Sequence, residues 1–149
     1  MAMTMTGEVQ LAASREVVWA KLNDAEVLKA CIPGCEELNK TSDTEFQAVA
    51  TQKIGPVKAR FKGKVQLSDL DPPNGYRISG EGEGGVAGFA KGGATVALAE
   101  KDGGTLLTYS VEAQIGGKLA QLGQRLINGA AKKVADDFFQ KFAATVAAG

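Results

Sequence analysis

The C-terminal stretch constrains the fold of this chain more than any other. From the Gly116-Gly117 pair to Gly149 it contains no proline, and strong helix formers dominate it. The double glycine marks the end of a preceding strand. A continuous helix from Gly117 to Val146 would be roughly 45 Å long at about 1.5 Å per residue, enough to span a small domain.

The apolar side of this predicted helix drifts around its axis. In the first half it comprises Leu119, Leu122, Leu126 and Ala130, with Gly123 among them; in the second half it comprises Ile127, Ala131, Val134, Ala135, Phe138 and Phe142. Such drift is typical of a helix that crosses a twisted sheet, and a kink at Asn128-Gly129 is the alternative. We interpret the stretch as a core helix. The open question is whether it covers a filled core or a cavity.

Composition excludes several classes of protein. The 149 residues fit one domain, and 17 basic and 17 acidic side chains cancel, so net charge gives no case for nucleic-acid binding. No apolar run reaches the length of a membrane span, and the first residues lack the features of a signal peptide. We therefore expect a cytoplasmic protein.

The few residues suited to chemistry also limit the function. The chain has no histidine, which removes Ser-His-Asp and Cys-His catalysis and histidine metal sites. Cys31 and Cys35 lack the further ligands that a zinc site needs. We expect one buried thiol and one turn thiol, and a redox pair is the alternative.

The rest of the chain alternates in the manner of strands. A strand is predicted over residues 3–11, followed by two short helices over Arg15–Leu22 and Ala25–Ala30, capped by Ser14 and Asp24. Six more strands are predicted: Glu36–Asn39, Glu45–Ile54, Val57–Asp69, Tyr76–Gly84, Gly88–Glu100 and Thr105–Ile115. The economical packing is an α+β helix-grip fold, a curved antiparallel sheet of about seven strands around the long C-terminal helix, as a single domain over residues 1–149.

Two motifs of the strand region have simple interpretations. Lys58, Arg60, Lys62 and Lys64 share one face of their strand, which predicts a solvated face with cross-strand pairs, Lys64 lying opposite Glu83. A surface for anionic lipid or an acidic partner is the alternative. The glycine-rich stretch from Gly80 to Gly85 matches a nucleotide-binding pattern, but no helix follows it and it carries two glutamates, so we reject that interpretation.

The residues predicted to face inward are unusually small. Ala48, Ala59, Gly63, Gly80 and Gly82 stand where a packed sheet would carry larger side chains. Glycines let a sheet coil sharply, but they also leave space beneath a helix. We predict an apolar cavity, with these walls: Trp19, Phe46, Phe61, Ile78, Phe89, Val96, Tyr109, Leu119, Leu122, Gly123, Leu126 and Ala130. Phe89 and Lys91 are ambiguous, because a bulge at Gly92-Gly93 would reverse their faces.

Four segments in order resemble one known family: CIPGCEEL, IGPVKARFKGKV, GFAKGGATVALAE and GGKLAQLGQRLINGAAKKVADDFF. The chain resembles, from about Gly7 to Val146, the carbon monoxide dehydrogenase CoxG family of the START/polyketide-cyclase-like superfamily (SRPBCC). The resemblance implies the helix-grip fold and a deep apolar cavity, with Gly123 and its neighbours facing the ligand. It also implies an accessory role beside an aerobic CO dehydrogenase or a related molybdenum hydroxylase.

The resemblance further implies that a lipophilic quinone is the cavity ligand and that the protein helps hold its partner enzyme at the inner face of the cytoplasmic membrane. It supplies no catalytic residue, and we expect no intrinsic cofactor or metal. Two rival functions remain open. One is a cyclase or hydrolase that uses Tyr109, Lys91 or Glu112. The other is a pure assembly factor that docks its partner through the Lys58–Lys64 row.

Overall fold

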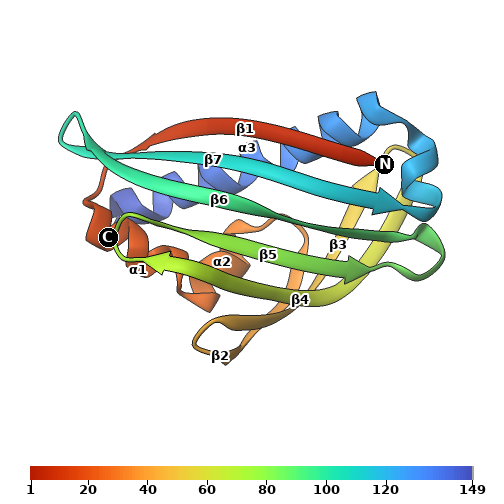
Figure 1. The fold of residues 1–149 in the computed structure, drawn as a ribbon, viewed down its shortest axis with the longest axis horizontal. Coiled ribbons are helices and arrows are strands. Elements are labelled where there is room, and N and C mark those ends of the chain that lie inside the picture. The colour runs from red at the N-terminus through yellow and green to blue at the C-terminus, as the bar shows by residue number, and fades with distance from the viewer. Residues whose placement is uncertain (149) are drawn as a thin grey trace.

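The computed structural model describes residues 1–148 and places one long helix across one face of a curved sheet (Figure 1). The strands are β1 (Ala2–Leu11), β2 (Cys35–Ser42), β3 (Glu45–Ile54), β4 (Val57–Asp71), β5 (Gly75–Glu83), β6 (Phe89–Lys101) and β7 (Gly104–Gly116). The helices are α1 (Arg15–Leu22), α2 (Ala25–Cys31) and α3 (Gln124–Ala148), with the 3-10 turns η1 (Gly85–Ala87) and η2 (Gly117–Leu122). All neighbouring strands are antiparallel, in the order β1-β7-β6-β5-β4-β3-β2. The predicted helix-grip fold is confirmed.

The two short helices begin where their capping residues predicted. The Ser14 hydroxyl accepts a hydrogen bond from the Val17 N–H at 3.3 Å, and the Asp24 carboxylate accepts from the Glu26 N–H at 2.9 Å. These bonds satisfy backbone donors that a helix cannot pair internally. Both helices follow β1 and close one end of the curved sheet (Figure 1).

The C-terminal helix starts later than predicted. The stretch from Gly117 to Leu122 forms η2, and Gly123, with a φ of 90°, separates it from α3. This φ lies in a region that glycine adopts readily and other residues do not, so the first turns end there and a new helix starts at Gln124. Leu119 and Leu122 therefore belong to η2. Helix α3 continues without interruption through Asn128-Gly129.

The register between β4 and β5 corrects one predicted pair. Lys64 lies opposite Glu81, and Glu83 lies opposite Lys62. The shift arises because the strands run closer to the turn than expected and a bulge follows Ser68, where Asp69 has a φ of 52°. A shift of two residues preserves the inward and outward faces, so the rest of the alternation holds.

Strand β6 runs without a bulge at Gly92-Gly93. Its pairing with β7 is continuous from Phe89 to Lys101. Phe89 and Lys91 therefore share the outer face of the sheet, and the prediction that Phe89 lines a cavity is wrong. Phe89 is 45% exposed, one of the most exposed large apolar side chains of the described chain.

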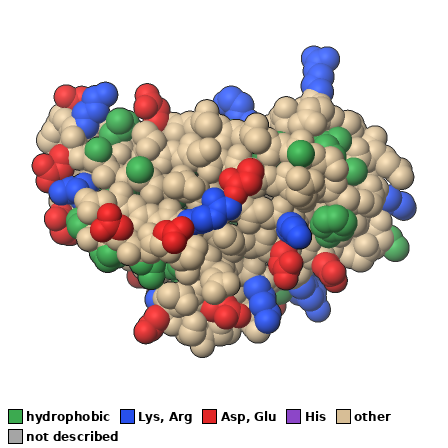
Figure 2. Space-filling model, viewed as in Figure 1, with side chains coloured by type: hydrophobic (Ala, Val, Ile, Leu, Met, Phe, Trp, Pro, Cys, Tyr) green, Lys and Arg blue, Asp and Glu red, His purple; other side chains and the backbone are tan. Residues whose placement is uncertain are grey.

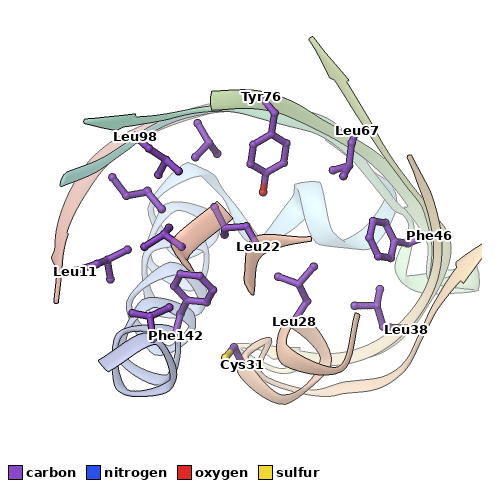
Figure 3. Packing of buried hydrophobic residues seen from close by; sticks show 14 residues of the cluster. Leu11, Leu22, Leu28, Cys31, Leu38, Phe46, Leu67, Tyr76, Leu98 and Phe142 are labelled. Atoms are coloured by element: carbon purple, nitrogen blue, oxygen red, sulfur yellow. The ribbon is translucent and has the colours of Figure 1, made fainter. Parts of the chain in front are cut away.

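The buried residues form two separate clusters. The larger cluster joins the inner face of the sheet to α1, α2 and the end of α3, and Figure 3 shows its side chains beneath the arch of the sheet. The smaller cluster lies near the N-terminus and consists of Met3, Ile115, Leu119 and Ile127. The core is therefore packed at both ends of the sheet. The region between the two clusters decides whether the molecule is hollow.

A candidate ligand-binding hollow between the sheet and the C-terminal helix

The middle of the inner sheet face is lined by small residues that stay half-buried. They come from β3 to β6 and are Ala48, Gly63, Gly80, Gly82, Ala90, Gly92 and Ala94. The side of the sheet on which they lie faces α3, yet none reaches the burial of the clusters at either end. The centre of the inner face therefore keeps part of its surface accessible to solvent, unlike the two packed clusters.

Helix α3 crosses the inner face of the sheet. Its buried side chains are Ile127, Phe142 and Val146, which lie towards its two ends. Between Ile127 and Phe142 the short side chains of Ala130, Ala131 and Ala135 occupy the first turns, whereas Phe138 and Phe139 pack against the larger cluster. The helix backbone approaches β1 and β3 more closely than the central strands β4 to β6. Helix α3 is therefore packed mainly at its two ends, and the sheet curves beneath it.

Two kinds of glycine line the inner face. At Gly63 an added Cβ would strike the backbone of Glu81, and at Gly92 it would strike the backbone of Glu112. These glycines permit the close strand approach that a sharply coiled sheet requires. At Gly82 the nearest atom to an added Cβ is 3.6 Å away and belongs to Phe61 of the neighbouring strand. Gly82 therefore has room for a Cβ in ordinary van der Waals contact, so close strand approach does not require glycine at this position.

The predicted cavity residues fall into three groups. Phe46, Val96 and Leu119 are buried within the packed clusters. The half-buried group comprises Trp19, Phe61, Ile78, Tyr109, Leu122, Gly123 and Ala130. Within it Trp19, Ile78 and Tyr109 pack against the larger cluster, and Phe61 and Leu122 pack against the smaller one. Leu126 is 40% exposed and lies against Gly55 in the β3–β4 turn, so it sits at one end of the molecule and not over the centre of the sheet.

A groove of about 390 Å³ opens where the edge strand β1 and helix α3 diverge. Residues 3–8 of β1 form one wall, and Tyr109, Asn128, Lys132 and Asp136 form the other. Tyr109 stacks on Phe139 with ring centroids 5.0 Å apart. Burial, aided by the charge of Asp136, raises the pKa of the Tyr109 hydroxyl, so it is a neutral donor at ordinary pH.

The polar wall of this groove was not predicted from the sequence. Asn128, Lys132 and Asp136 recur at intervals of four and so share one stripe of α3. Lys132 and Asp136 are both exposed, and the Lys132 amine forms an ion pair with Asp136 at 2.7 Å. That β1 passes alongside this stripe follows from the tertiary structure.

The basic row of β4 lies on the outer face, as predicted. Arg60 pairs with Glu36 at 3.3 Å and Lys64 with Glu45 at 4.0 Å, so its charge pairs cross to β2 and β3. The Glu36 pKa is lowered, first by a hydrogen bond from Thr51 and then by Arg60. Beside this row a shallow depression of about 420 Å³ runs over β2 to β4.

The residues suggested for catalysis are not brought together. Lys91 and Glu112 lie on the outer face, where Glu112 forms an ion pair with Arg77, while Tyr109 points inward. Among residues 1–148, no cluster of three or more histidine, cysteine or acidic side chains is suited to a metal ion. Cys31 is buried and Cys35 half-buried, both as free thiols, and burial raises the pKa of Cys35. This arrangement offers a binding space without an acid–base pair inside it.

Comparison with solved structures supports the fold. The chain is similar to a conserved protein from Geobacillus kaustophilus, with 34% identity, a TM-score of 0.91, and coverage of 97% of this chain and 95% of that one. It also resembles the Zhui aromatase/cyclase from Streptomyces sp. R1128 at 10% identity and a TM-score of 0.72, over 98% of this chain and 94% of that one. Ara h 8.0201 matches at 14% identity and a TM-score of 0.68, over the full length of both chains. The last two likenesses show the fold alone.

Comparison by sequence identifies the family. No curated protein matches the chain significantly. The family model described as carbon monoxide dehydrogenase CoxG matches residues 7–147, nearly the whole chain. The predicted resemblance is confirmed, and this protein belongs to the carbon monoxide dehydrogenase CoxG family.

Proposed function

We propose that this protein is a non-catalytic accessory of a carbon monoxide dehydrogenase or a related molybdenum hydroxylase, and that it holds a lipophilic molecule of the quinone class under α3. Family membership implies the accessory role. The observation that carries the binding proposal is the half-buried, small-residue centre of the inner sheet face. The separation of the catalytic candidates Tyr109, Lys91 and Glu112 supports binding over turnover.

The binding energy would be hydrophobic. The space is bordered by apolar side chains from Phe61, Ile78 and Leu122. Removing about 200 Å² of apolar ligand surface from water contributes roughly 5 kcal/mol at about 25 cal/mol per Å², before the cost of association. An elongated apolar molecule fits this requirement better than a polar metabolite does.

A plugging variant tests the binding proposal. Gly82→Leu places a large side chain into the hollow, at a position whose neighbours leave room for a Cβ. We expect a short-chain ubiquinone to bind the wild type in titration and native mass spectrometry, and the variant to bind it more than about tenfold more weakly, which is roughly 1.4 kcal/mol. The matched control is Glu81→Leu, one residue earlier and on the outer face, which should bind like the wild type.

Three outcomes of this titration count against the proposal. Wild-type protein that binds no quinone contradicts it directly. Equal binding by Gly82→Leu and the wild type places the ligand outside the hollow. Turnover of a hydrophobic substrate that is lost in Tyr109→Phe would favour the cyclase or hydrolase class instead.

Recruitment to a membrane surface is the second part of the proposal. The β3–β4 turn, the β5–β6 turn and the start of α3 lie at one end of the molecule (Figure 1). We call this end the open end. Val86 is 86% exposed there, together with Phe89 and Leu126. The exposed basic side chains of these segments are Lys53, Lys58, Lys118 and Arg125.

Exposed apolar tips within a basic surround suit an anionic lipid surface, because the tips enter the interface and each cation adds attraction of about 1 kcal/mol. Figure 2 shows acidic side chains at both ends of this face, gathered more densely at the opposite end. The structure contains no helix of residues 1–148 that is long and apolar enough to cross a membrane. Binding at the surface is therefore the mode proposed.

Liposome sedimentation tests the recruitment. We expect binding to vesicles containing phosphatidylglycerol, weaker binding to phosphatidylcholine alone, and loss of binding in Val86→Ser with Phe89→Ser. Leu70→Ser is the matched control, because Leu70 is 43% exposed near the end of β4 and away from the open end. Equal loss in this control, or no preference for anionic lipid, would contradict the proposal.

The basic row of β4 has an alternative role to consider, which is to bind the partner enzyme on the outer face of the sheet. Lys62 and Lys64 flank the depression over β2 to β4. Charge reversal of both lysines should abolish co-purification with the hydroxylase if this face is the interface. Unchanged co-purification would place the partner elsewhere.

A further inference from the structure

Strand β1 leaves one edge of the sheet open, because it pairs with β7 alone over its whole length. Met1 and Ile115, the pair just before this ladder, exchange two backbone hydrogen bonds, of 2.8 and 2.7 Å. Pairs of this kind recur at every second residue of an antiparallel ladder, so the odd-numbered residues of β1 bond to β7. The backbone N–H and C=O groups of Thr4, Thr6 and Glu8 therefore point towards the open edge.

The open edge of β1 lacks the features that usually protect a sheet edge. Lysine, proline and bulges are the common ones. Strand β1 contains neither lysine nor proline, its register with β7 has no shift, and its single charged residue is Glu8. Strand β2, at the opposite edge, has two register shifts and carries Glu36, Glu37 and Lys40. Pairing with a further strand is therefore open at β1 and hindered at β2.

The groove of about 390 Å³ beside β1 follows this open edge. Residues 3–8 all line it, although successive side chains of a strand point to opposite faces of the sheet. A wall made of consecutive residues is the edge of the strand and not one of its faces. The facing wall includes Asn128, Lys132 and Asp136 of α3. The groove therefore runs between an unpaired strand edge and a helix.

The helix wall carries hydrogen-bonding groups at a spacing that suits an extended chain. Its three polar side chains recur every four residues, about 6 Å apart along α3. Alternate residues of an extended chain are about 6.6 Å apart. The Asn128 amide can donate and accept, the Lys132 ammonium donates, and the Asp136 carboxylate accepts. These groups can therefore meet the N–H and C=O groups on the far edge of a strand that pairs with β1.

A free segment fits this groove better than a second copy of the chain does. In a second copy β1 is already bonded to β7, so the rest of that sheet would have to lie where α3 forms the wall. The occupant must therefore have two free edges. Glu8 is exposed and forms no ion pair within residues 1–148, whereas Lys132 and Asp136 pair with each other. A basic side chain on the occupant would supply the missing partner of Glu8.

We propose that the groove between β1 and α3 binds an extended peptide segment of a partner protein, which adds a strand to the sheet beside β1 and places a basic residue next to Glu8. Recognition rests mainly on backbone hydrogen bonds, so many side chains are tolerated and the segment must be free of other secondary structure. The inference goes beyond the proposed function and does not depend on a ligand under α3, because the groove lies at the edge of the sheet.

A blocked hexapeptide, one lysine followed by five threonines, tests the proposal. Threonine favours extended structure, and the lysine lies next to Glu8 when the peptide runs antiparallel to β1. We expect this peptide to bind the wild type in a titration followed by the NMR signals of the backbone amides. The control peptide has proline in place of the third and fourth threonines. It loses an N–H group from each edge and should bind at least about tenfold more weakly.

Thr6→Pro removes one outward N–H group of β1 and leaves the pairing with β7 in place. We expect its affinity for the threonine peptide to fall by at least about tenfold. Thr6→Val is the matched control, because it keeps the N–H group and the branched side chain, and it should bind within about twofold of the wild type. Hydrogen exchange in the wild type needs no variant. The peptide should slow exchange at Thr4, Thr6 and Glu8 but not at Met5 and Gly7, which already bond to β7.

Each contrary result overturns the proposal. Wild type that does not bind the threonine peptide does so, as does equal binding by Thr6→Pro or exchange that slows equally at odd and even residues of β1. If Thr6→Pro does not fold, the exchange pattern decides. Sedimentation that shows self-association of the wild type, abolished in Thr6→Pro, would assign the edge to a second copy and overturn the choice of a free segment. None of these results bears on quinone binding, which Gly82→Leu tests separately.

Discussion

At the residue scale, the buried hydroxyl of Tyr76 couples stability to alkaline pH. Its folded pKa of about 12 lies above the ordinary value of 10, because burial disfavours the phenolate. Because the pKa is higher in the folded state, the neutral hydroxyl makes its full contribution to the free energy of unfolding below about pH 10. That contribution is lost as the pH rises towards 12. Between these pH values the unfolded chain is stabilised by releasing the hydroxyl proton, whereas the folded chain keeps that proton.

Tyr76→Phe should therefore flatten the alkaline decline of stability. Between pH 9 and pH 11 we expect the free energy of unfolding of the wild type to fall by about 1.4 kcal/mol more than that of the variant. Urea titrations at the two pH values measure this difference. Identical pH dependence in both proteins would show that the hydroxyl reaches water freely.

A pair of facing glycines gives a second residue-scale prediction. Gly63 and Gly82 lie opposite each other on β4 and β5. An added methyl at Gly63 would strike the backbone of Glu81, whereas at Gly82 it has room. We expect Gly63→Ala to lower the free energy of unfolding by about 1–3 kcal/mol and Gly82→Ala to leave it within about 0.5 kcal/mol. Chemical denaturation measures both, and equal losses would contradict the distinction between the two kinds of glycine.

At the element scale, the junction between η2 and α3 sets where the helix begins. Gly123 has a φ of 90°, and Gly129 lies within α3 with no atom within 4 Å of an added Cβ. The same substitution should therefore act in opposite directions. Gly123→Ala should destabilise by about 1–2 kcal/mol, because alanine is strained at this φ, and Gly129→Ala should stabilise by up to about 1 kcal/mol through helix propensity.

Thermal unfolding followed by circular dichroism checks this pair. Stabilisation by Gly123→Ala would mean that η2 and α3 merge into one helix in solution, as the proline-free sequence suggested. Destabilisation by Gly129→Ala would mean that the middle of α3 is pressed against the sheet, which would contradict a hollow beneath it.

At the scale of the whole molecule, the buried side chains of α3 lie towards its two ends, and the proposed ligand would lie between them. A ligand in that centre would supply the contacts that the helix lacks. Saturation at about 100 times the dissociation constant should stabilise the fold by about 2.7 kcal/mol. We expect hydrogen exchange to slow most in the part of α3 between Ile127 and Phe142 and in the facing strands. Protection confined to the β1–α3 groove would relocate the ligand to that groove.

The two ends of the molecule differ in their charged side chains, although the net charge of the chain is zero. The open end combines exposed apolar tips with Lys53, Lys118 and Arg125, whereas acidic side chains gather at the other end of the face in Figure 2. If the open end binds an anionic surface, as proposed, such a charge separation would orient the molecule there without a net positive charge. Composition therefore gives no indication of this property.

The elements and their faces could be predicted from the chain alone, because both depend on local periodicity and capping. Alternation placed Lys58–Lys64 outward and Gly80 and Gly82 inward, and Ser14 and Asp24 marked both short helices. The family could be predicted too, because the ordered motifs span the chain.

Contacts between distant segments settled the remaining features. A single backbone angle at Gly123 shortened the helix, a bulge after Ser68 moved the Lys64 pair, and continuous β6–β7 pairing turned Phe89 outward. The burial of Tyr76 against Trp19 became visible only in three dimensions, because the two residues lie far apart in the chain.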